Sequence, residues 1–529
     1  MDNAAFYTFN KSTSGEIVPS IIVSESETKA LHSMVDPKRE AQRLISQIPD
    51  DTGCLIFLGL GGGFACEAAL DLTQARIIAV DFNKDAIAQL LAGRDYSNLL
   101  KNSRFSLFVD MQSGELKKFI LESYRPQIAG GIKIIPLRAR TEHDREKFEM
   151  AAQAIQESID IITGDYSVQA HFGMRWFSNI IRNAKNPSLC ENQAKLPVQV
   201  KRAAIAAAGP SLDSQMESIA KMKYEGVYII STDTASGALV QSGIEPDVIV
   251  SIDCQHISYY HFTGSLLREK LRSVPLVLDI ASPPLLSGLC AFPVFFASGH
   301  PFARYICAQW RSLPQLDTSG GNVTYTCLSL AERLGADHIT IFGADFSYIG
   351  SRTYARGAYI NPYFSARQNR LSALEAQMSS FLYRSPFLAQ EGEKKIYRET
   401  SSLRHYRRKL EEKASMMQAH VECAKGFGPT VIIENKNCGA GKKEYEDGNI
   451  KMNLSGIEFL AQYRDGIASL PKAGGTDDYF NLLNAKEKLI FTTLLPFAAA
   501  IRKRNPRLKS ADVIEETKKL CVMKIDAVL

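Results

Sequence analysis

Short apolar runs alternate with longer amphipathic segments in two regions of the chain, residues 54–137 and 203–342. Short apolar runs are typical of buried strands, and the segments between them have the apolar spacing of helices. This alternation predicts a mainly parallel sheet with helices on both faces in each region. The expected strands are 54–58, 75–80, 104–109 and 132–137 in the first region, and 203–208, 227–231, 248–252, 276–280, 294–297 and 338–342 in the second.

A helical period governs the apolar positions between and after these regions. It predicts helices over 141–186, 373–383 and 452–529, with a break at 473–475, and a short strand is expected at 430–433. The predicted fold class is α/β and multidomain. The expected parts are a Rossmann-like N-terminal domain (1–140), a helical connector (141–196), a central, mainly parallel α/β sheet domain (197–445) and a helical C-terminal domain (446–529).

Composition narrows the class of protein. The length of 529 residues predicts about three to four domains, and the hydrophobic (45%) and charged (22%) shares are those of a globular protein. The formal charge of +5 is mild, so no nucleic-acid partner is expected. The ten cysteines form no Cys-x-x-Cys pair, which favours a reducing cytoplasm over a disulfide framework or a zinc site. No signal peptide or membrane-length apolar run is visible, so we expect a cytoplasmic protein without a membrane span.

A glycine-rich turn follows the first strand of the N-terminal region. Gly59, Gly61 and Gly63 precede a helix that is expected to start near Phe64. Asp81 ends the next strand at the spacing of the ribose-binding acid in Rossmann-like domains. These residues predict a site for a nucleotide or S-adenosylmethionine. The alternative is a degenerate Rossmann-like domain whose glycines serve only a tight turn.

Turn residues and acids follow several strands of the central region. Gly209, Pro210 and Ser211 stand where the first central strand gives way to a helix, whose unpaired backbone N–H groups suit a phosphate. Loops at the carboxyl ends of parallel strands form the binding crevice of such a sheet. Asp233 and Asp253 each follow a strand and are either crevice residues or helix caps. With further turns at 318–321 and 342–345, the set predicts a nucleotide-linked substrate.

These motifs carry a resemblance to a known family. Residues 208–212, the turn 243–247 leading to Ser251-Ile252-Asp253, and residues 320–323 leading through a helix to 335–345 resemble the motility accessory factor (Maf) flagellin glycosyltransferases. The order of these motifs along the chain is also similar, more loosely, to that in bacterial sialyltransferases and in MptE-like pterin pyrophosphokinases. The resemblance covers the central domain well and extends over most of the chain.

The resemblance implies a function. Maf proteins transfer a nonulosonic acid of the pseudaminic or legionaminic type from its CMP-activated form to serine or threonine hydroxyls of flagellin in the cytoplasm, and flagellar assembly and motility require this step. The implied partners are therefore flagellin and a CMP-activated nonulosonic acid. In the Maf layout, a loop corresponding to residues 435–441 returns toward the sugar site.

The resemblance also implies roles for individual residues. Tyr348 and Tyr354 are similar to two sialyltransferase tyrosines that contact the phosphate, although their spacing differs by about one residue. The catalytic set is expected to be Asp253, Tyr348, Tyr354 and His261. The nucleotide sugar is expected at Gly209, Pro210, Ser211, Thr232, Asp233, Gln255, Ser319, Gly320 and Asp345, with Ser319 and Gly320 opening a second helix.

The sequence does not single out one residue as the proton acceptor, and it leaves the use of a metal ion open. Histidine suits proton transfer near neutral pH, and His256, His300 and His405 are candidates beside His261. No Asp-x-Asp motif occurs, so a mechanism that requires no cofactor is preferred. Magnesium held by Asp233 and Asp253 is the alternative.

Other functions stay open at this point. One is an MptE-like pterin pyrophosphokinase that uses ATP and magnesium, and another is a methyltransferase that uses S-adenosylmethionine through the N-terminal domain. A third is a flagellin chaperone without enzymatic activity. A glycosyltransferase of the Maf type is expected to gain thermal stability from CMP, but not from ATP or S-adenosylmethionine.

Overall fold

The computed structural model describes residues 5–190, 196–197, 199–270, 272–391, 396–435, 453–474 and 479–529. The chain divides into two compact units, of which the first contains residues 1–174 and 464–524 and the second contains residues 175–463 and 525–529. This division is coarser than the four ranges expected from the sequence, which stay a prediction. The boundary expected at 445–446, the loop 436–441 and Gly475 lie outside the described residues.

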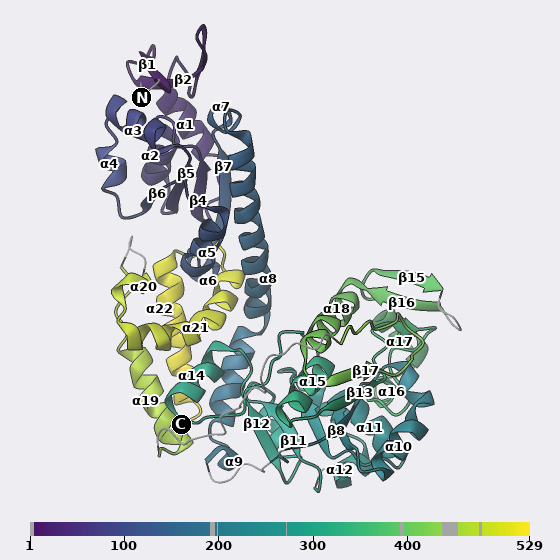
Figure 1. Cartoon of the computed structure of the whole chain (residues 1–529). Coiled ribbons are helices and arrows are strands. Elements are labelled where there is room, and N and C mark those ends of the chain that lie inside the picture. The colour runs from purple at the N-terminus through teal and green to yellow at the C-terminus, as the bar shows by residue number, and fades with distance from the viewer. Residues whose placement is uncertain are drawn as a thin grey trace. The chain divides into compact units, whose positions relative to one another are not determined.

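The first unit is built on a parallel sheet of four strands in the order β6-β5-β4-β7 (Figure 1). Leu55 and Phe57 pack on one face of the sheet, whereas Ile56 and Leu58 pack on the other. Both faces are therefore buried, as expected for parallel strands between helices. The strands agree with the predicted ones to within two residues: β4 (Thr52–Leu58), β5 (Arg76–Asp81), β6 (Phe105–Val109) and β7 (Gly131–Pro136).

An antiparallel sheet that the sequence did not predict precedes these strands. It consists of β1 (Tyr7–Lys11), β2 (Ile17–Ser24) and β3 (Glu27–Ala30) in that order. Val18 and Ile21 of the largely apolar β2 reach the core of the first unit, whereas the end of β1 and most of β3 are polar and exposed. Pro19 lies within the apolar run of β2, and a proline inside such a run argues against a strand, so the sequence pattern does not predict this sheet.

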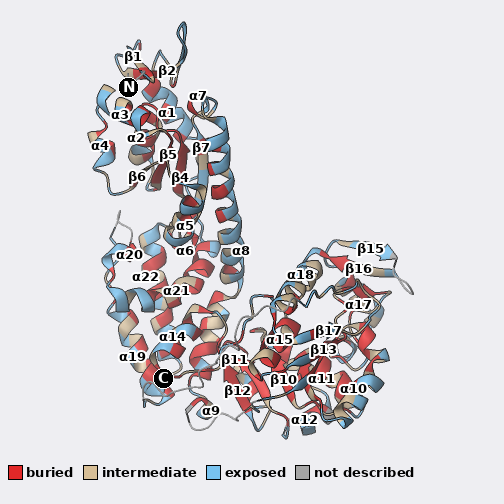
Figure 2. Ribbon diagram, in the orientation of Figure 1, coloured by how far each residue is buried: buried red, intermediate tan, exposed pale blue. Residues whose placement is uncertain are grey.

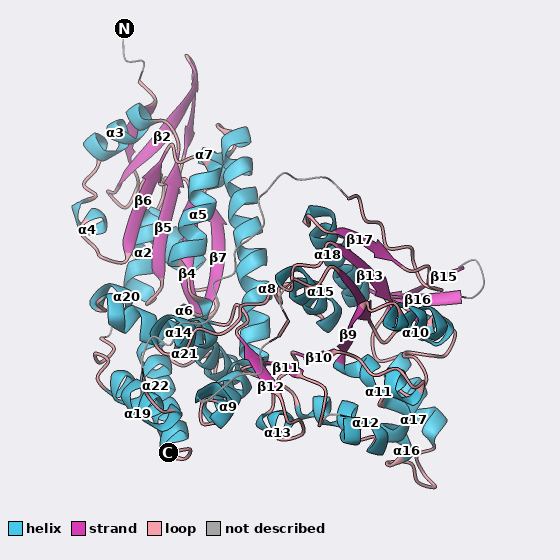
Figure 3. Cartoon of the chain, turned by 60° about the horizontal axis from the view of Figure 1, so that its bottom comes forward, coloured by secondary structure: helices cyan, strands magenta, loops and turns pink. Residues whose placement is uncertain are grey.

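Helices cover the sheet of the first unit. The long helix α8 (Arg145–Asn183) contributes Phe148 and Ile155 to the core cluster that contains Ile56, and Figure 3 shows this helix beside β7. The other helices of this unit are α1 (Pro37–Ile45), α2 (Phe64–Leu72), α3 (Lys84–Gly93), α4 (Ser97–Leu100), α5 (Ser113–Ser123), α6 (Pro126–Ala129), α7 (Arg138–Thr141), α20 (Tyr479–Leu482), α21 (Ala485–Arg504) and α22 (Ser510–Asp526).

The second unit contains a parallel sheet of seven strands in the order β12-β11-β10-β9-β8-β13-β17. Strands β9 to β12 are almost entirely buried, whereas the edge strand β17 is more exposed (Figure 2). The α/β fold class is therefore confirmed in both units. The strands are β8 (Arg202–Ala206), β9 (Tyr228–Thr232), β10 (Val248–Ser251), β11 (Leu276–Asp279), β12 (Pro293–Phe296), β13 (His338–Phe342) and β17 (His420–Cys423).

Alternate residues of β8 face opposite helical layers. Ala203 and Ile205 lie in a core cluster with residues of α15 and α18, whereas Ala204 and Ala206 lie in a cluster with residues of α10 and α11. The remaining elements are α9 (Pro187–Cys190), η1 (Pro210–Ser214), α10 (Met216–Tyr224), α11 (Asp233–Gln241), η2 (His256–Phe262), α12 (Ser265–Lys270), α13 (Pro284–Ser287), α14 (Pro301–Gln309), α15 (Val323–Arg333), α16 (Ile360–Ser365), α17 (Leu374–Leu382), α18 (Ser401–Met416) and α19 (Gly456–Ala468), with the sheet β14 (Tyr348–Ile349), β16 (Ile396–Thr400) and β15 (Phe387–Glu391).

The strand predicted at 430–433 is wrong. These residues form no strand, and the edge of the sheet is β17, which pairs with β13. Val431 and Ile433 pack against the core from a loop, and the N–H of Ile432 donates to the Glu411 side chain at 3.0 Å. The backbone N–H of Ile432 is therefore satisfied by a side chain and not by a neighbouring strand. A short run of apolar residues looks the same in a packed loop and in a strand, so the sequence pattern cannot distinguish them.

The described residues include no helix that is long and apolar enough to cross a membrane.

Candidate functional site

The turn after β8 is fastened to the turn after β13. Gly209 N donates to the carbonyl oxygen of Gly343 at 2.8 Å, and Ser211 N donates to Asp345 Oδ2 at 2.7 Å. The hydroxyl of Ser211 donates to Asp345 Oδ1. A Cβ added to Gly209 would lie 2.4 Å from Gly343 O, so this approach requires glycine.

This arrangement corrects an expectation from the sequence. Pro210 has no N–H group, and the N–H groups of Gly209 and Ser211 already have acceptors, so none of the three offers a backbone donor to a phosphate. The buried carboxylate of Asp345 takes the place expected for the anion. Asp345 therefore holds the turn together instead of facing a nucleotide sugar in this structure.

The loop that follows β17 also hydrogen-bonds to Ser211 and Asp345. Phe427 N donates to Ser211 Oγ at 2.7 Å and to Asp345 Oδ1 at 3.2 Å. A Cβ on Gly426 would lie 2.6 Å from Asp345 Oδ1. The ends of three neighbouring strands, β8, β13 and β17, thus converge on one Ser–Asp pair.

Asp213 in η1 fixes the segment that carries Tyr354. Its carboxylate accepts from the Arg352 guanidinium and, at 2.8 Å, from Arg356 N. Ala355 N donates to the carbonyl oxygen of Ala208 at 2.9 Å. The phosphate-contact candidate Tyr354 is therefore held at the carboxyl end of β8, as its expected role requires.

Asp233 and His261 form a pair at the carboxyl end of β9. His261 Nδ1 lies 3.2 Å from Asp233 Oδ2, which also accepts from the Ser251 hydroxyl at 2.7 Å. Asp233 Oδ1 accepts from Thr234 N at 2.7 Å and from the Thr234 hydroxyl at 3.0 Å. Burial opposes ionisation of Asp233, but His261 and the hydrogen bonds outweigh burial and lower the pKa of the carboxyl group.

The pKa of Asp253 is shifted in the opposite direction to that of Asp233. Burial raises the pKa of Asp253, against a hydrogen bond from Gln255 N at 2.9 Å, and the nearby charge of Asp233 raises it further. Gln255, expected to bind the nucleotide sugar, precedes η2 and turns its side-chain amide toward Asp253 Oδ2 at 3.4 Å. Two neighbouring carboxyl groups whose pKa values are driven apart are a common arrangement of acid–base sites.

Thr232 has a structural role beside this pair. It is the N-cap of α11, and its hydroxyl oxygen accepts from Ala235 N at 3.2 Å. The helix-cap role considered for Asp233 thus belongs to Thr232. This leaves Asp233, the first residue of α11, to engage Ser251 and His261.

Aromatic rings surround the Asp233–His261 pair. The ring of Tyr359 lies 4.3 Å from that of His261 and 6.0 Å from that of Tyr354. Burial raises the pKa of Tyr359 to about 12, and the charges of Asp233 and Asp253 contribute. Burial, with Tyr359 and Tyr348 nearby, also raises the pKa of Tyr354. Expected residues 233, 253, 261 and 354 are thus brought together.

Tyr348 lies close enough to Tyr354 to influence its pKa, whereas Ser319 and Gly320 lie in other surroundings. Tyr348 is buried in β14, where it pairs with Arg398 of β16. Ser319 and Gly320 do not open a helix, because α15 begins at Val323 with Asn322 as its cap. Ser319 N instead donates to Asp317 Oδ1 at 2.9 Å. The second helix start expected at residues 319–320 is therefore wrong.

The other candidate histidines differ from His261 in their surroundings. His300 is buried and caps α14 by accepting from Phe302 N, and burial lowers its pKa to about 3. His256 and His405 are exposed. Among the four candidates, His261 is the one that lies against Asp233, and its charge also acts on Asp253.

Asp233 and Asp253 do not fit a resident magnesium site. Both Asp233 oxygens face hydrogen-bond donors, and its Oδ2 also faces His261. Magnesium needs free oxygen ligands in near-octahedral geometry. The described residues contain no group of three or more His, Cys, Asp or Glu side chains that could hold a metal ion.

The glycine turn of the first unit is filled by the protein's own side chains. Gly62 N donates to His32 Nε2 at 2.8 Å, and the hydroxyl of Tyr96 donates to Gly61 O at 2.7 Å. Gly59, Gly61 and Gly63 have φ angles of +95°, +52° and +75°, which explains the glycines by turn geometry.

Asp81 is a core residue and not an exposed ribose ligand, which corrects the expectation for it. Its Oδ1 lies 2.9 Å from Arg140 Nη2, and both side chains are fully buried. Its carboxylate also accepts from Leu60 N at 2.8 Å and from Phe82 N at 2.7 Å. Burial raises the pKa of Asp81, and Arg140 and these hydrogen bonds oppose the shift.

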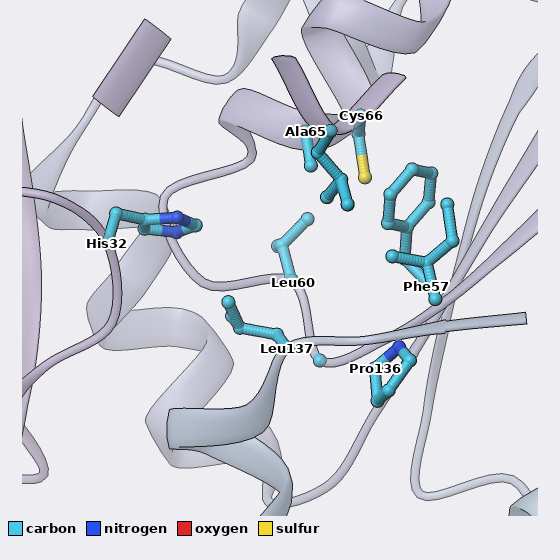
Figure 4. A pocket seen from close by; sticks show the side chains of 10 residues that line it. His32, Phe57, Leu60, Ala65, Cys66, Pro136 and Leu137 are labelled. Atoms are coloured by element: carbon cyan, nitrogen blue, oxygen red, sulfur yellow. The ribbon is translucent and has the colours of Figure 1, made fainter. Parts of the chain in front are cut away.

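The cavity beside this glycine turn is small. Its volume is about 40 Å³, and Figure 4 shows Phe57, Leu60, Leu137 and Cys66 around it. Ligand pockets typically enclose about 300–1,000 Å³. The cavity as it stands therefore cannot hold a nucleotide or S-adenosylmethionine, which favours the degenerate Rossmann-like interpretation.

Comparison with known proteins bears on both units. Residues 175–351 match the family model "MptE-like: 6-hydroxymethylpterin diphosphokinase MptE-like". The structure of MAf glycosyltransferase from Magnetospirillum magneticum AMB-1 is similar with a TM-score of 0.55 and 13% identity, over 100% of this chain and 93% of that chain. This chain has the MAf glycosyltransferase fold. The resemblance found in the sequence is therefore confirmed at the level of the fold.

Two curated relatives come from Treponema pallidum (strain Nichols), and each is named "Uncharacterized protein". One is 41% identical over 93 residues, which is 18% of this chain and 33% of the relative. The other is 28% identical over 196 residues, which is 35% of this chain and 92% of the relative. The match thus spans about a third of the first relative, and neither name carries a function.

Three residues that the sequence analysis did not count among the site residues contact the candidate site. Ser251, Asp213 and Tyr359 each contact a candidate residue or its supporting loop. Tyr359 belongs to a tyrosine-rich segment, 354–364, that follows the last expected strand, and this clustering was the available signal. Nothing in the sequence near Asp213 indicates its distant partners.

Proposed function

We propose that this protein is a glycosyltransferase that moves a nonulosonic acid from its CMP-activated form to serine or threonine hydroxyls of flagellin. The observation that carries the proposal is the likeness of the whole chain to a MAf glycosyltransferase. The identity of 13% supports the fold alone, so the activity rests additionally on the residues at the carboxyl ends of β9 and β10.

His261 is the proposed proton acceptor. Asp233 lies against Nδ1, so it orients the ring and stabilises the imidazolium that forms, and Nε2 accepts the proton of the acceptor hydroxyl. The lowered pKa of Asp233 keeps it ionised for this role at neutral pH. In the step, the bond between the anomeric carbon and the phosphate oxygen breaks and CMP leaves. A bond forms from that carbon to the acceptor oxygen, and the proton moves to His261.

Tyr354 and Tyr359 are proposed to contact the leaving phosphate. Their raised pKa values keep both phenols protonated, so each can donate a hydrogen bond to an anion. Asp253, whose pKa is raised by burial and by the charge of Asp233, is proposed to lie beside the same substrate-facing edge as Asp233. No step requires a metal ion.

A pterin pyrophosphokinase is the second candidate function, because residues 175–351 match the MptE-like family model. That match covers about a third of the chain. The chemistry requires magnesium beside ATP, and Asp233 and Asp253 do not fit a resident magnesium site. We therefore place it behind the glycosyltransferase.

The test uses the full-length protein with purified flagellin and CMP-activated pseudaminic or legionaminic acid. Intact mass spectrometry is expected to show flagellin heavier by one or more sugar residues, and CMP, but not ATP, is expected to raise the melting temperature. His261→Asn is expected to abolish transfer and retain the CMP shift, whereas His256→Asn, an exposed residue of the same helix, keeps both. Stabilisation by ATP with AMP release from a pterin substrate would instead establish the pyrophosphokinase.

A further inference from the structure

A run of aromatic rings extends from the Asp233–His261 pair across the second unit. We call this set the ring wall: Tyr260, Tyr354, Tyr359, Tyr363, Phe364 and Phe381. Neighbouring ring centroids lie 4.8 Å apart for Tyr260–Tyr363, 6.1 Å for Tyr359–Tyr363, 6.0 Å for Tyr354–Tyr359, 6.5 Å for Tyr354–Phe381 and 5.9 Å for Phe364–Phe381. The wall therefore joins η2, the loop after β14, α16 and α17.

Two exposed arginines lie on this ring wall. The guanidinium carbon of Arg367 is 3.6 Å from the Tyr363 ring centroid, and its Nη2 donates to the Tyr260 hydroxyl at 3.0 Å. The guanidinium carbon of Arg384 is 4.0 Å from the Phe381 ring centroid. An arginine stacked on a ring keeps its charge and presents its planar donors outward.

Neither arginine is neutralised within the described part of the chain. Carboxylates pair with Arg352, Arg404 and Arg407, but no described carboxylate forms an ion pair with Arg367 or Arg384. Arg384 nevertheless acts on the site, since its charge opposes the rise in the pKa values of Tyr354 and Tyr359. It is thus close to the tyrosines that border His261.

A negatively charged substrate requires positive charge at this site to offset the repulsion from the two acids. Asp233 and Asp253 place negative charge where the substrate must approach, and a CMP-activated nonulosonic acid carries both a phosphate and a carboxylate. Like charges repel strongly in a partly buried site. Arginine forks bind carboxylate and phosphate through paired, charge-assisted hydrogen bonds.

We propose that Arg367 and Arg384 form an anion subsite that holds the carboxylate or phosphate of the substrate against the ring wall beside His261. The proposal rests on the proposed function for the identity of the substrate, but not for anion binding itself. Arg384 provides the sharper test, because Arg367 also fastens Tyr260 and Tyr363.

The test measures the thermal shift and binding of three probes: N-acetylneuraminate for the carboxylate, inorganic pyrophosphate for the phosphate, and uncharged N-acetylmannosamine as the neutral control. The full-length protein is compared with Arg384→Gln, Arg367→Lys and the matched control Arg370→Gln, an exposed residue of the same segment. We expect at least one anion to bind the wild type and Arg370→Gln, and Arg384→Gln to weaken that binding about tenfold or more. The neutral sugar is expected to give no shift in any variant.

The anion whose binding falls identifies the group that the subsite holds. The proposal is overturned if neither anion binds, or if Arg384→Gln binds both as tightly as the wild type. Arg367→Lys keeps the charge and is expected to lose less affinity than Arg384→Gln. Flagellin transfer is measured separately, so absent transfer with intact, Arg384-dependent anion binding refutes the proposed function and leaves the subsite standing.

Discussion

Ser211 donates both its backbone N–H and its hydroxyl to the carboxylate of Asp345, a residue 134 positions further along the chain. The two residues follow adjacent strands, β8 and β13, whose carboxyl ends meet at one edge of the sheet. A motif that suggests phosphate binding in the sequence is therefore an internal fastening in the folded protein. Its backbone donors are the same groups that a phosphate would use.

Ser211→Ala is expected to destabilise the second unit. The substitution removes the hydroxyl donor to Asp345 and the acceptor of Phe427 N, and a buried charged group that loses a partner costs about 1–3 kcal/mol. Urea unfolding measures the free energy, with Ser385→Ala at an exposed position as the control. An unchanged unfolding free energy would show that the fastening contributes nothing.

Asp213→Asn is expected to loosen the segment that carries Tyr354. The change removes the charge that pairs with Arg352, while the amide oxygen can still accept from Arg356 N. We expect the affinity for CMP to fall about three- to tenfold with a loss of stability below about 1 kcal/mol, as for a partly exposed ion pair. Calorimetric titration of CMP measures the first quantity. Equal affinity in the two proteins would exclude a positioning role for Asp213.

Asp233→Asn is expected to lower the transfer rate by about 10²–10⁴-fold, because the amide cannot stabilise the imidazolium of His261. The free energy of unfolding should also depend less on pH in the acidic range. The folded pKa of Asp233 lies below its ordinary value, so the native carboxylate contributes stability above about pH 4 that is lost as the pH falls through the lower, folded pKa. Rate measurements and melting curves between pH 3 and 7 check the two effects. A rate within about twofold of wild type would remove Asp233 from the mechanism.

Asp279 is expected to give the opposite pH dependence. Burial raises its pKa from 3.8 to about 6, although Ala281 N donates to it at 2.8 Å. The native state therefore binds the proton more tightly than the unfolded state, and this group makes stability fall as the pH rises from about 4 to about 6. Asp279→Asn should remove a decline on the order of 3 kcal/mol, whereas the exposed Asp337→Asn should not. Parallel pH profiles for Asp279→Asn and wild type would contradict this assignment.

Arg140→Met is expected to cost about 3–5 kcal/mol of stability in the first unit, because it leaves the buried Asp81 carboxylate unpaired. The double variant Arg140→Met/Asp81→Asn should recover part of this loss, since no charge then stays buried. Chemical unfolding of the single and double variants measures the coupling. Independent, additive losses would show that the pair is not a unit. S-adenosylmethionine is expected to leave the melting temperature of the wild type unchanged.

The sequence predicted the sheets well, because buried parallel strands are short, almost wholly apolar runs between turn residues. Every strand expected between 203 and 342 is present. The segments that failed have weaker patterns. Residues 7–30 form strands with many exposed polar positions, and Val431 and Ile433 pack from a loop.

The candidate site was predicted in part. Asp233, Asp253, His261 and Tyr354 were named from strand ends and from the resemblance, and they lie together around Tyr359. Asp81, Asp345 and Ser319 were named by the same reasoning but engage Arg140, Ser211 and Asp317 within the protein. The local sequence around an acid that follows a strand is the same whether the acid faces a ligand or an internal partner, because the internal partner is distant in the chain.

The sequence by itself determined the α/β class, the position of the central strands and the edge of the sheet where a site would form. These follow from local hydrophobic period and from the rule that loops at carboxyl strand ends share one edge. Only the tertiary structure decided which acid faces His261, which one pairs with Arg140 and which one accepts hydrogen bonds from Ser211. That choice depends on contacts between residues far apart in the chain, which no local pattern encodes.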